Sequence, residues 1–135
     1  MAVDPSLAGR TFPATASYVA SHEKLVEFAS ATGSAYDGSI APATFPIVVA
    51  FQAMTTLMED PSVGIVLHRV VHGEQRFSHT RPVVAGDALS AVLTVDFVRQ
   101  IGGADIIGTR SEITDSAGRP VCTAYATLVH RGEDQ

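Results

Sequence analysis

The sequence predicts a single α+β domain in which a curled antiparallel sheet wraps around a central apolar helix. The chain has 135 residues, 46% of them hydrophobic and 17% charged, which is enough for one domain with a substantial core. The helical segment 46–58 contains a run, Ile47–Phe51, that is apolar all round, and nearly everything after the segment has the pattern of strands separated by turns. A sheet wrapped around that helix buries both, so we expect one domain over residues 1–135.

The N-terminal part is predicted to hold one amphipathic helix. Residues 1–20 read as an extended lead-in that contains a short strand, Phe12–Val19. Ser21 is a good N-cap residue, and the apolar side chains that follow keep helical spacing over 22–32. Gly33 then provides a natural stop.

A second helix is predicted from Pro46 to about Met58. Proline fits the first turn of a helix, because its missing N–H has no partner there in any case. A loop of small residues, 34–44, precedes the helix, and Glu59-Asp-Pro-Ser62 ends it. The run Ile47–Phe51 is apolar all round, so we expect this helix to be buried on most sides.

The remainder is predicted to form four or five antiparallel strands. Turns are expected at Gly102-Gly103 and over Asp115–Pro120, and a fraying tail over 131–135. Gly108 lies inside a strand pattern and is interpreted as a bulge or bend that lets the sheet curl. The predicted strand segments are 63–71, 73–82, 89–98, 104–114 and 121–130.

Composition and charge narrow the function classes. A net charge of −5 argues against nonspecific nucleic-acid binding, and no apolar run approaches the roughly 18 residues of a membrane helix. The first residues lack the order of a signal peptide, and the single cysteine, Cys122, excludes a disulfide framework within the chain. That single cysteine fits a reducing cytoplasm best. No His, Asp and Glu residues have metal-ligand spacing, so we expect neither a metal nor a cofactor.

Positive charge is concentrated in segment 68–81, where Glu74 is the one acidic residue. One interpretation is a solvated strand face. The other is a docking patch for a phosphate or for an acidic carrier protein. The basic residues are His68, Arg69, His72, Arg76, His79 and Arg81.

Three segments, Ala41–Phe51, Val71–Phe77 and Arg81–Asp87, together resemble the MaoC-like hot-dog proteins, which hydrate or dehydrate acyl thioesters. The most specific parts are Ala41-Pro-Ala-Thr-Phe-Pro46 and His72-Gly-Glu-Gln75. The resemblance covers about residues 8–130. It implies the hot-dog fold, the same arrangement of sheet and helix that the pattern predicts.

The residues expected to perform the chemistry are missing. Dehydration of a 3-hydroxyacyl thioester needs a base, an acid and a donor for the thioester oxygen. In active members the resemblance assigns the acid and base to an Asp-x-Asn-Pro-x-His string, near which Ser34, Tyr36 and Ser39 stand here. Val49 and Ala50 replace the His-Gly of the helix start, where the Ala50 N–H remains a candidate donor.

Weaker candidates for catalysis remain, each with a structural role as its alternative. Asp37 is the sole carboxylate between Glu27 and Glu59 and would need a distant histidine as its partner. Cys122 is expected to be a core thiol, and no serine has a nucleophile-elbow pattern. The other candidate pairs are His72 with Glu74 and His79 with Asp87.

The resemblance is strongest to the dyad-lacking subunit of heteromeric (R)-3-hydroxyacyl thioester dehydratases. It implies an acyl-thioester-binding subunit, noncatalytic by itself, whose ligand is an acyl-CoA or acyl-carrier-protein thioester. The chain would pair with a dyad-bearing hot-dog subunit or with a second copy of itself. The predicted substrate-binding residues are Phe45, Val49, Ala50, Phe51, Arg76 and Arg81, with ordinary core as the alternative for the apolar ones.

Two rival functions stay open at the level of sequence. One is a self-sufficient homodimeric hydratase or thioesterase with a substituted base. The other is a nonenzymatic acyl-CoA-binding module.

Overall fold

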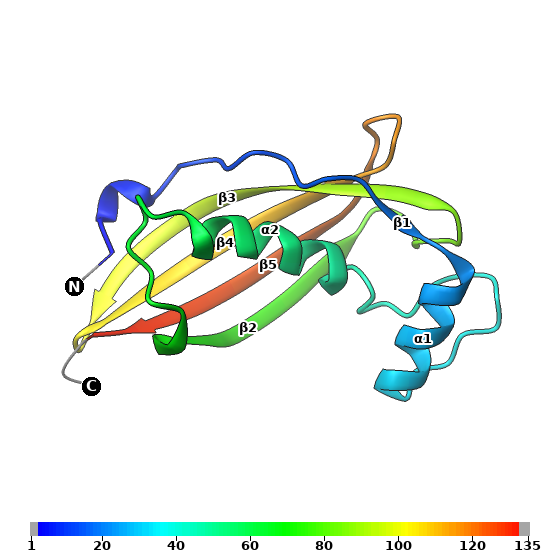
Figure 1. The fold of residues 1–135 in the computed structure, drawn as a ribbon, viewed down its shortest axis with the longest axis horizontal. Helices are drawn as coiled ribbons and strands as arrows, with labels where there is room; N and C mark the ends of the chain where they lie inside the picture. The colour runs from blue at the N-terminus through cyan, green and yellow to red at the C-terminus, as the bar shows by residue number, and fades with distance from the viewer. Residues whose placement is uncertain (1–2, 133–135) are drawn as a thin grey trace.

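A five-stranded antiparallel sheet curves around one long helix in the computed structural model, which describes residues 3–132 (Figure 1). The strand order is β1-β3-β4-β5-β2, so β2 forms one edge and the short β1 the other. This confirms the predicted α+β hot-dog architecture. The elements are β1 Tyr18–Ala20, α1 His22–Thr32, α2 Ile47–Glu59, β2 Val70–His79, β3 Asp87–Ile101, β4 Ala104–Thr114 and β5 Pro120–Arg131.

Both predicted helices are confirmed, because local signals mark their ends. The Ser21 hydroxyl accepts a hydrogen bond from the Lys24 N–H at 3.2 Å and caps α1. Gly33 ends α1 in the left-handed conformation, with φ at 69°. The second helix begins one residue after Pro46.

Helix α2 crosses the concave face of the sheet and buries one side against it (Figure 1). The buried side faces core residues of β3 and β4 such as Leu93 and Ile107. Phe51 is 52% exposed, so the expectation that the helix is buried on most sides is wrong. The buried α2 residues are Val49, Ala50, Ala53, Met54 and Leu57.

The strand segments 89–98, 104–114 and 121–130 are confirmed as the long strands β3, β4 and β5. The bulge predicted at Gly108 instead lies opposite it, because the β3–β4 register shifts between Val95 and Phe97. A Cβ at position 108 would overlap the Phe97 ring, so the glycine makes room for that ring.

The predicted strand Phe12–Val19 is mostly wrong. Regular pairing is confined to Tyr18–Ala20, and the residues before it make isolated bonds to β3, such as Phe12 N–H to the Leu93 carbonyl at 2.9 Å. Pro13 lacks the N–H that a continuous ladder needs.

The predicted strand Val63–Val71 is also wrong up to residue 69. Gly64 has φ at 83°, which breaks an extended run, and Leu67–Arg69 form a 3-10 turn. Regular pairing begins at Val70, and the segment predicted over 73–82 ends as a strand at His79.

A buried contact ties this turn to the end of β5. The Nε2 atom of His130 accepts a hydrogen bond from the Val66 N–H at 3.0 Å. Its Nδ1 lies 3.5 Å from a carboxylate oxygen of Asp105, and the same oxygen accepts a bond from the Val3 N–H at 2.8 Å. His130 and Asp105 are both buried, so they fix the N-terminal segment and the turn against the sheet.

The predicted tail falls partly inside the fold. Arg131 belongs to β5, so fraying from residue 131 is wrong, while 133–135 lie outside the described residues. None of the helices in the part of the chain that the structure describes is both long and apolar enough to cross a membrane.

Candidate functional site

A groove of about 820 Å³ lies between α1, the start of α2 and the edge strand β2. Two of the segments that carry the family resemblance, Ala41–Phe51 and Val71–Phe77, contribute to its walls. We call this cavity the edge groove. Its lining residues are Phe28, Thr32, Ala43, Thr44, Ile47, His72, Gly73, Glu74, Gln75, Arg76, Phe77 and His79.

A one-residue bulge decides which β2 side chains face inward. His72 pairs with Leu128 and Glu74 pairs with Thr127, so Gly73 is the extra residue. Leu128 is buried in the core and Thr127 is on the other face, so His72 faces the core side and Glu74 the outer side. The next residue, Gln75, returns to the core side.

The bulge therefore brings His72 and Gln75 together and separates His72 from Glu74. The His72 Nε2 lies 2.9 Å from the Gln75 Oε1, a hydrogen bond between side chains. Glu74 instead accepts a bond from the Thr127 hydroxyl at 3.5 Å. The proposed acid–base pair of His72 and Glu74 is not assembled.

The pair His79 and Asp87 is not assembled either. The His79 Nε2 is 2.8 Å from the Ala43 carbonyl oxygen, which ties the end of β2 to the loop before α2. Asp87 accepts hydrogen bonds from Arg81 and from the Val84 N–H. Each residue has a local structural partner in place of the other.

The Ala50 N–H at the start of α2, the candidate donor for a thioester oxygen, is not free. The Ala50 N–H donates to the Pro46 carbonyl at 2.9 Å, and the Val49 N–H donates to the same oxygen at 3.1 Å. The Ile47 and Val48 N–H groups donate to Thr44 and Phe45. The first turn is thus closed on itself, so these groups cannot also stabilise a thioester oxygen.

Asp37 lies on an exposed loop outside the lining of the edge groove. Its carboxylate accepts bonds from the Ser39 hydroxyl at 2.7 Å and the Ser39 N–H at 2.9 Å, and these bonds lower its pKa. A general base at neutral pH needs the opposite shift. Nearby, the His22 Nδ1 lies 3.1 Å from the Tyr36 hydroxyl.

A second, smaller cavity lies beneath α2 and has a volume of about 180 Å³. Its walls are apolar except for one imidazole. His72 lines both this cavity, which we call the inner pocket, and the edge groove. The lining residues of the inner pocket are Phe51, Met54, Met58, Leu67, Val70, His72 and Leu128.

The predicted substrate-binding residues do not line one common cavity. Phe51 lines the inner pocket and Arg76 lines the edge groove. Phe45, Val49 and Ala50 are buried in the core and line neither cavity. Phe45 packs edge-on against Phe28 of α1, with 5.3 Å between the ring centroids.

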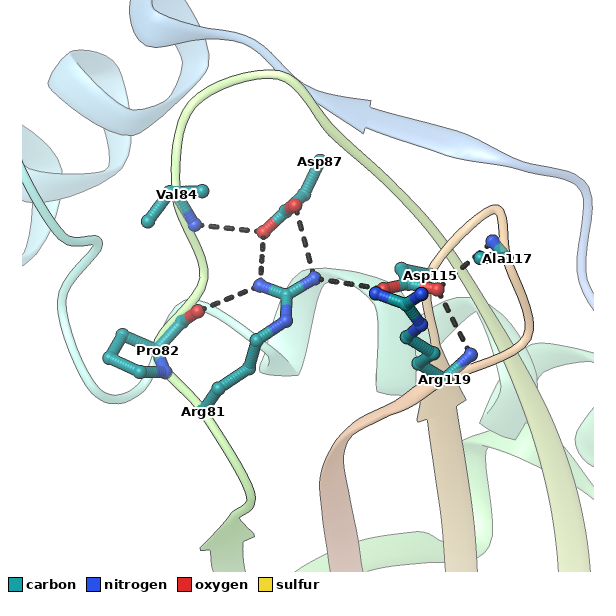
Figure 2. A network of polar contacts seen from close by, with 7 residues as sticks. All are labelled: Arg81, Pro82, Val84, Asp87, Asp115, Ala117 and Arg119. Atoms are coloured by element: carbon teal, nitrogen blue, oxygen red, sulfur yellow. Dashed lines mark hydrogen bonds and ion pairs between the residues drawn. The ribbon is translucent and has the colours of Figure 1, made fainter.

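Arg81 is held in a network of its own (Figure 2). Its guanidinium donates to both carboxylate oxygens of Asp87, at 2.8 and 3.2 Å, and to Asp115 at 3.3 Å. The hydrogen bond with Asp87 raises the pKa of Arg81. The network joins the loop after β2 to the β4–β5 turn, so the guanidinium already has its anionic partners.

The basic segment does not form one patch. The Arg76 guanidinium stacks over the Tyr125 ring at 4.3 Å on the outer face of the sheet, whereas His72 faces the core side and Arg81 belongs to its own network. Three of the basic residues, His72, Arg76 and His79, line the edge groove, but the six do not gather into a single patch.

Cys122 is buried, as predicted for a core thiol, and burial raises its pKa to about 11. Thiolate chemistry at neutral pH is thereby disfavoured. Across residues 3–132, no three His, Cys, Asp or Glu side chains are grouped in a way that could hold a metal ion.

Sequence reasoning missed Gln75 as the partner of His72. The glycine at position 73, inside a strand pattern, is the signal that could have indicated the bulge. It also missed the contact between His130 and Asp105, for which the sequence carries no local signal.

Comparison with protein families matches residues 6–124 to the family described as "FAS1-like, dehydratase domain region". A UPF0336 protein of Clavibacter michiganensis is 43% identical, with 99% of each chain covered. A UPF0336 protein of Streptomyces coelicolor is 40% identical, with 100% of this chain and 99% of the relative covered.

Among solved structures, a chain of the HadBC (3R-hydroxyacyl-ACP dehydratase) complex of Mycobacterium tuberculosis is similar, with a TM-score of 0.79 and 30% identity. The match covers 91% of this chain and 96% of that one. The R-hydratase PhaJ1 of Pseudomonas aeruginosa shares the fold, with a TM-score of 0.69, 18% identity and coverage of 93% and 83%.

Proposed function

Because this chain belongs to the FAS1-like dehydratase-region family of MaoC-like hot-dog proteins, we propose that it is the acyl-thioester-binding subunit of an (R)-3-hydroxyacyl thioester dehydratase and is noncatalytic by itself. The dyad-bearing hot-dog subunit that it joins would supply the acid and the base. The ligand would be an acyl chain carried on CoA or on acyl carrier protein.

The observation that carries this proposal is an edge groove lined by both apolar and polar side chains in which none of the candidate catalytic pairs is assembled. His72 is bonded to Gln75 and His79 to a backbone carbonyl, while Glu74 faces the other side of the sheet. The N–H groups at the start of α2 are used within their own turn. An acyl thioester could be held here, but the groups that would act on it must come from elsewhere.

The edge strand β2 supports the proposal that a second subunit completes the groove. It is ten residues long, is exposed at most positions and forms one edge of the sheet, whereas β1 at the other edge has three residues. A long exposed edge is a site for pairing with another strand. A subunit added there would lie directly along the edge groove.

Activity should depend on the partner. The purified chain alone should not hydrate a trans-2-enoyl-CoA above background. When a hot-dog subunit that carries Asp-x-Asn-Pro-x-His is added, the rate at low substrate concentration should be at least about tenfold above that of the partner alone. Burying two acyl methylenes against this chain would already tighten substrate binding by about that factor. A coupled spectrophotometric assay of hydration measures both rates.

Robust turnover by the chain alone would contradict the noncatalytic role and favour the self-sufficient enzyme. In that case Asp37→Asn tests whether the Asp37 carboxylate is the substituted base, because its loss should then abolish turnover. Acyl-CoA binding with no gain in rate on adding the partner would favour a binding module.

Assembly should fail when the edge of β2 is charged. Val71→Lys and Ser78→Lys together place two positive charges on exposed positions of the strand that would pair, so we expect the dimer or heterodimer to dissociate into single chains. Size-exclusion chromatography with light scattering measures the mass. Val26→Lys on the exposed side of α1 is the matched control and should leave the mass unchanged; equal masses for all variants would place the interface elsewhere.

A further inference from the structure

His130 is a buried histidine that lies outside the proposed acyl-thioester site. It is 1% exposed, belongs to β5 and does not line the edge groove. The neighbouring strands place Val70 of β2 and Asp105 of β4 opposite it in the sheet. A buried histidine becomes a proton sensor when its hydrogen bonds require one protonation state, because histidine is the side chain that ordinarily titrates near neutral pH.

The contacts of the His130 ring require the neutral state. Its Nε2 accepts a hydrogen bond from the Val66 N–H at 3.0 Å, so this nitrogen carries no proton. The neutral ring therefore holds its proton on Nδ1, which lies 3.5 Å from a carboxylate oxygen of Asp105. That distance is long for a hydrogen bond, and Nδ1 has no hydrogen-bond partner among residues 3–132.

One hydrogen bond to this ring anchors residues 64–69, which lead into β2 and which we call the entry turn. Among the residues that the structure describes, the bond from the Val66 N–H to His130 is the one hydrogen bond that joins the entry turn to a residue distant in the sequence. The side chains of Val66 and Leu67 are 40% and 64% exposed, so little packing holds them. The His130 ring is therefore the main polar anchor of the entry turn.

A protonated ring is incompatible with the closed turn. The imidazolium carries a hydrogen on each nitrogen, so Nε2 would direct a hydrogen at the Val66 N–H in place of a lone pair. Two donors would then face each other, and neither would have an acceptor. Proton binding at Nε2 therefore requires the entry turn to move away from His130.

Asp105 makes the open arrangement the better proton binder. Its carboxylate lies beside Nδ1 and favours a positively charged ring. In the closed form the Val66 N–H opposes that charge, whereas in the open form Nε2 can donate to water and the attraction of Asp105 remains. Because the open form binds the proton more tightly, a fall in pH must shift the equilibrium toward opening.

The other charges on the surrounding segments do not reverse this direction. Asp4 of the N-terminal segment is exposed and accepts a hydrogen bond from the Ser6 N–H. Arg131, the next residue of β5, is exposed and projects from the opposite face of the strand. His68 and Arg69 belong to the entry turn itself, so opening moves their positive charge away from a protonated ring.

We propose that His130 is a proton-operated latch: the neutral ring holds the entry turn against β5, and the protonated ring releases it. The entry turn ends where β2 begins at Val70, so its release frees the start of the edge strand. The latch does not depend on the proposed function, because none of its contacts lies in the edge groove.

Amide hydrogen exchange of the unaltered chain, followed by NMR from pH 7.5 to pH 5 and corrected for intrinsic exchange rates, tests the latch. The protection factor of the Val66 amide should fall at least about tenfold over this range, since an equilibrium coupled to one proton changes by up to about a factor of ten for each pH unit. The Ile107 amide, in the centre of the sheet, should keep its protection, because the opening is local.

Two variants assign the response to one histidine. His130→Gln keeps an acceptor for the Val66 N–H but binds no proton, so the protection of Val66 should no longer depend on pH. His68→Gln changes the exposed histidine of the entry turn and is the matched control, in which the fall should persist. Circular dichroism melting verifies that both variants are folded.

The imidazole nitrogens give a readout that needs no variant. Nitrogen-15 spectra of the histidine side chains at pH 7.5 should place the His130 proton on Nδ1 and leave Nε2 bare. A proton on Nε2 at this pH, or a Val66 protection factor that does not change with pH, overturns the latch. So does a His130→Gln protein that keeps the whole fall, or a parallel loss of protection at Ile107, which would mean that the whole sheet opens.

Discussion

Replacing His130 with leucine should lower the free energy of unfolding by about 3 kcal/mol. His130 is 1% exposed, and its Nε2 is the acceptor for the Val66 N–H. Leucine removes that acceptor and leaves the buried Asp105 carboxyl, which accepts a bond from the Val3 N–H, facing an apolar side chain at position 130. Each buried polar group that loses its partner costs roughly 1–3 kcal/mol. Urea unfolding followed by circular dichroism measures the change.

Two further variants separate this contact from general effects of replacing a histidine. His68→Leu changes an exposed residue of the same neighbourhood and should alter stability by less than about 0.5 kcal/mol. His130→Gln keeps an acceptor and a donor and should fall between leucine and the unaltered protein. A His130→Leu protein as stable as the His68→Leu protein would show that the buried contact contributes nothing.

The contact between His130 and Asp105 also shows what sequence reasoning could not reach. His130 was predicted as the last residue of a strand, and it is the residue before the last in β5. Its partners come from a turn before β2 and from β4, far away in the sequence, and no periodicity connects them. By contrast, α1 was predicted to the residue, because Ser21 and Gly33 act on their immediate neighbours.

Two strands were predicted wrongly because the β-propensity of each segment was given more weight than a local signal within it. The 63–71 segment is rich in branched apolar residues, yet Gly64 turns the chain and the Val66 N–H bonds to a histidine ring in place of a neighbouring strand. The 12–19 segment does not form a continuous strand, because Pro13 has no backbone N–H to donate to the neighbouring strand. In both cases one backbone group overrides the composition of the whole segment.

Two of the three segments that carry the family resemblance line the edge groove, but the sequence does not give the arrangement of their side chains. Strict alternation along the strand would place His72 and Glu74 on one face, and the Gly73 bulge reverses that relation. A single inserted residue therefore decides whether a carboxylate meets the imidazole, and here it does not.

Arg81→Met should destabilise the protein by about 2 kcal/mol at neutral pH and by much less in acid. Burial alone raises the pKa of Asp87, but hydrogen bonds from Arg81 and the Val84 N–H outweigh burial and the net pKa is lowered. The pKa of Asp115 is also lowered, first by the Arg119 N–H and then by Arg81. These are the contacts drawn in Figure 2.

The sign of the pH dependence follows from these lowered values. A carboxyl whose pKa is lower in the folded than in the unfolded chain contributes stability that is complete above about pH 4 and is lost as the pH falls through the folded pKa. The unaltered protein should therefore keep its advantage over Arg81→Met from neutral pH down to about pH 4 and lose it progressively at lower pH. Urea unfolding of both proteins across this range measures the difference.

Arg119→Met is the matched control, since the Arg119 side chain is exposed and it is the Arg119 backbone N–H that bonds to Asp115. It should change stability by less than about 0.5 kcal/mol at every pH. A constant gap between Arg81→Met and the unaltered protein from neutral to acid would mean that the Arg81 stem stabilises by packing and that its charge does not. A gap that closes in acid assigns the stability to the ion pairs, and with it the anchoring of the loop that follows β2.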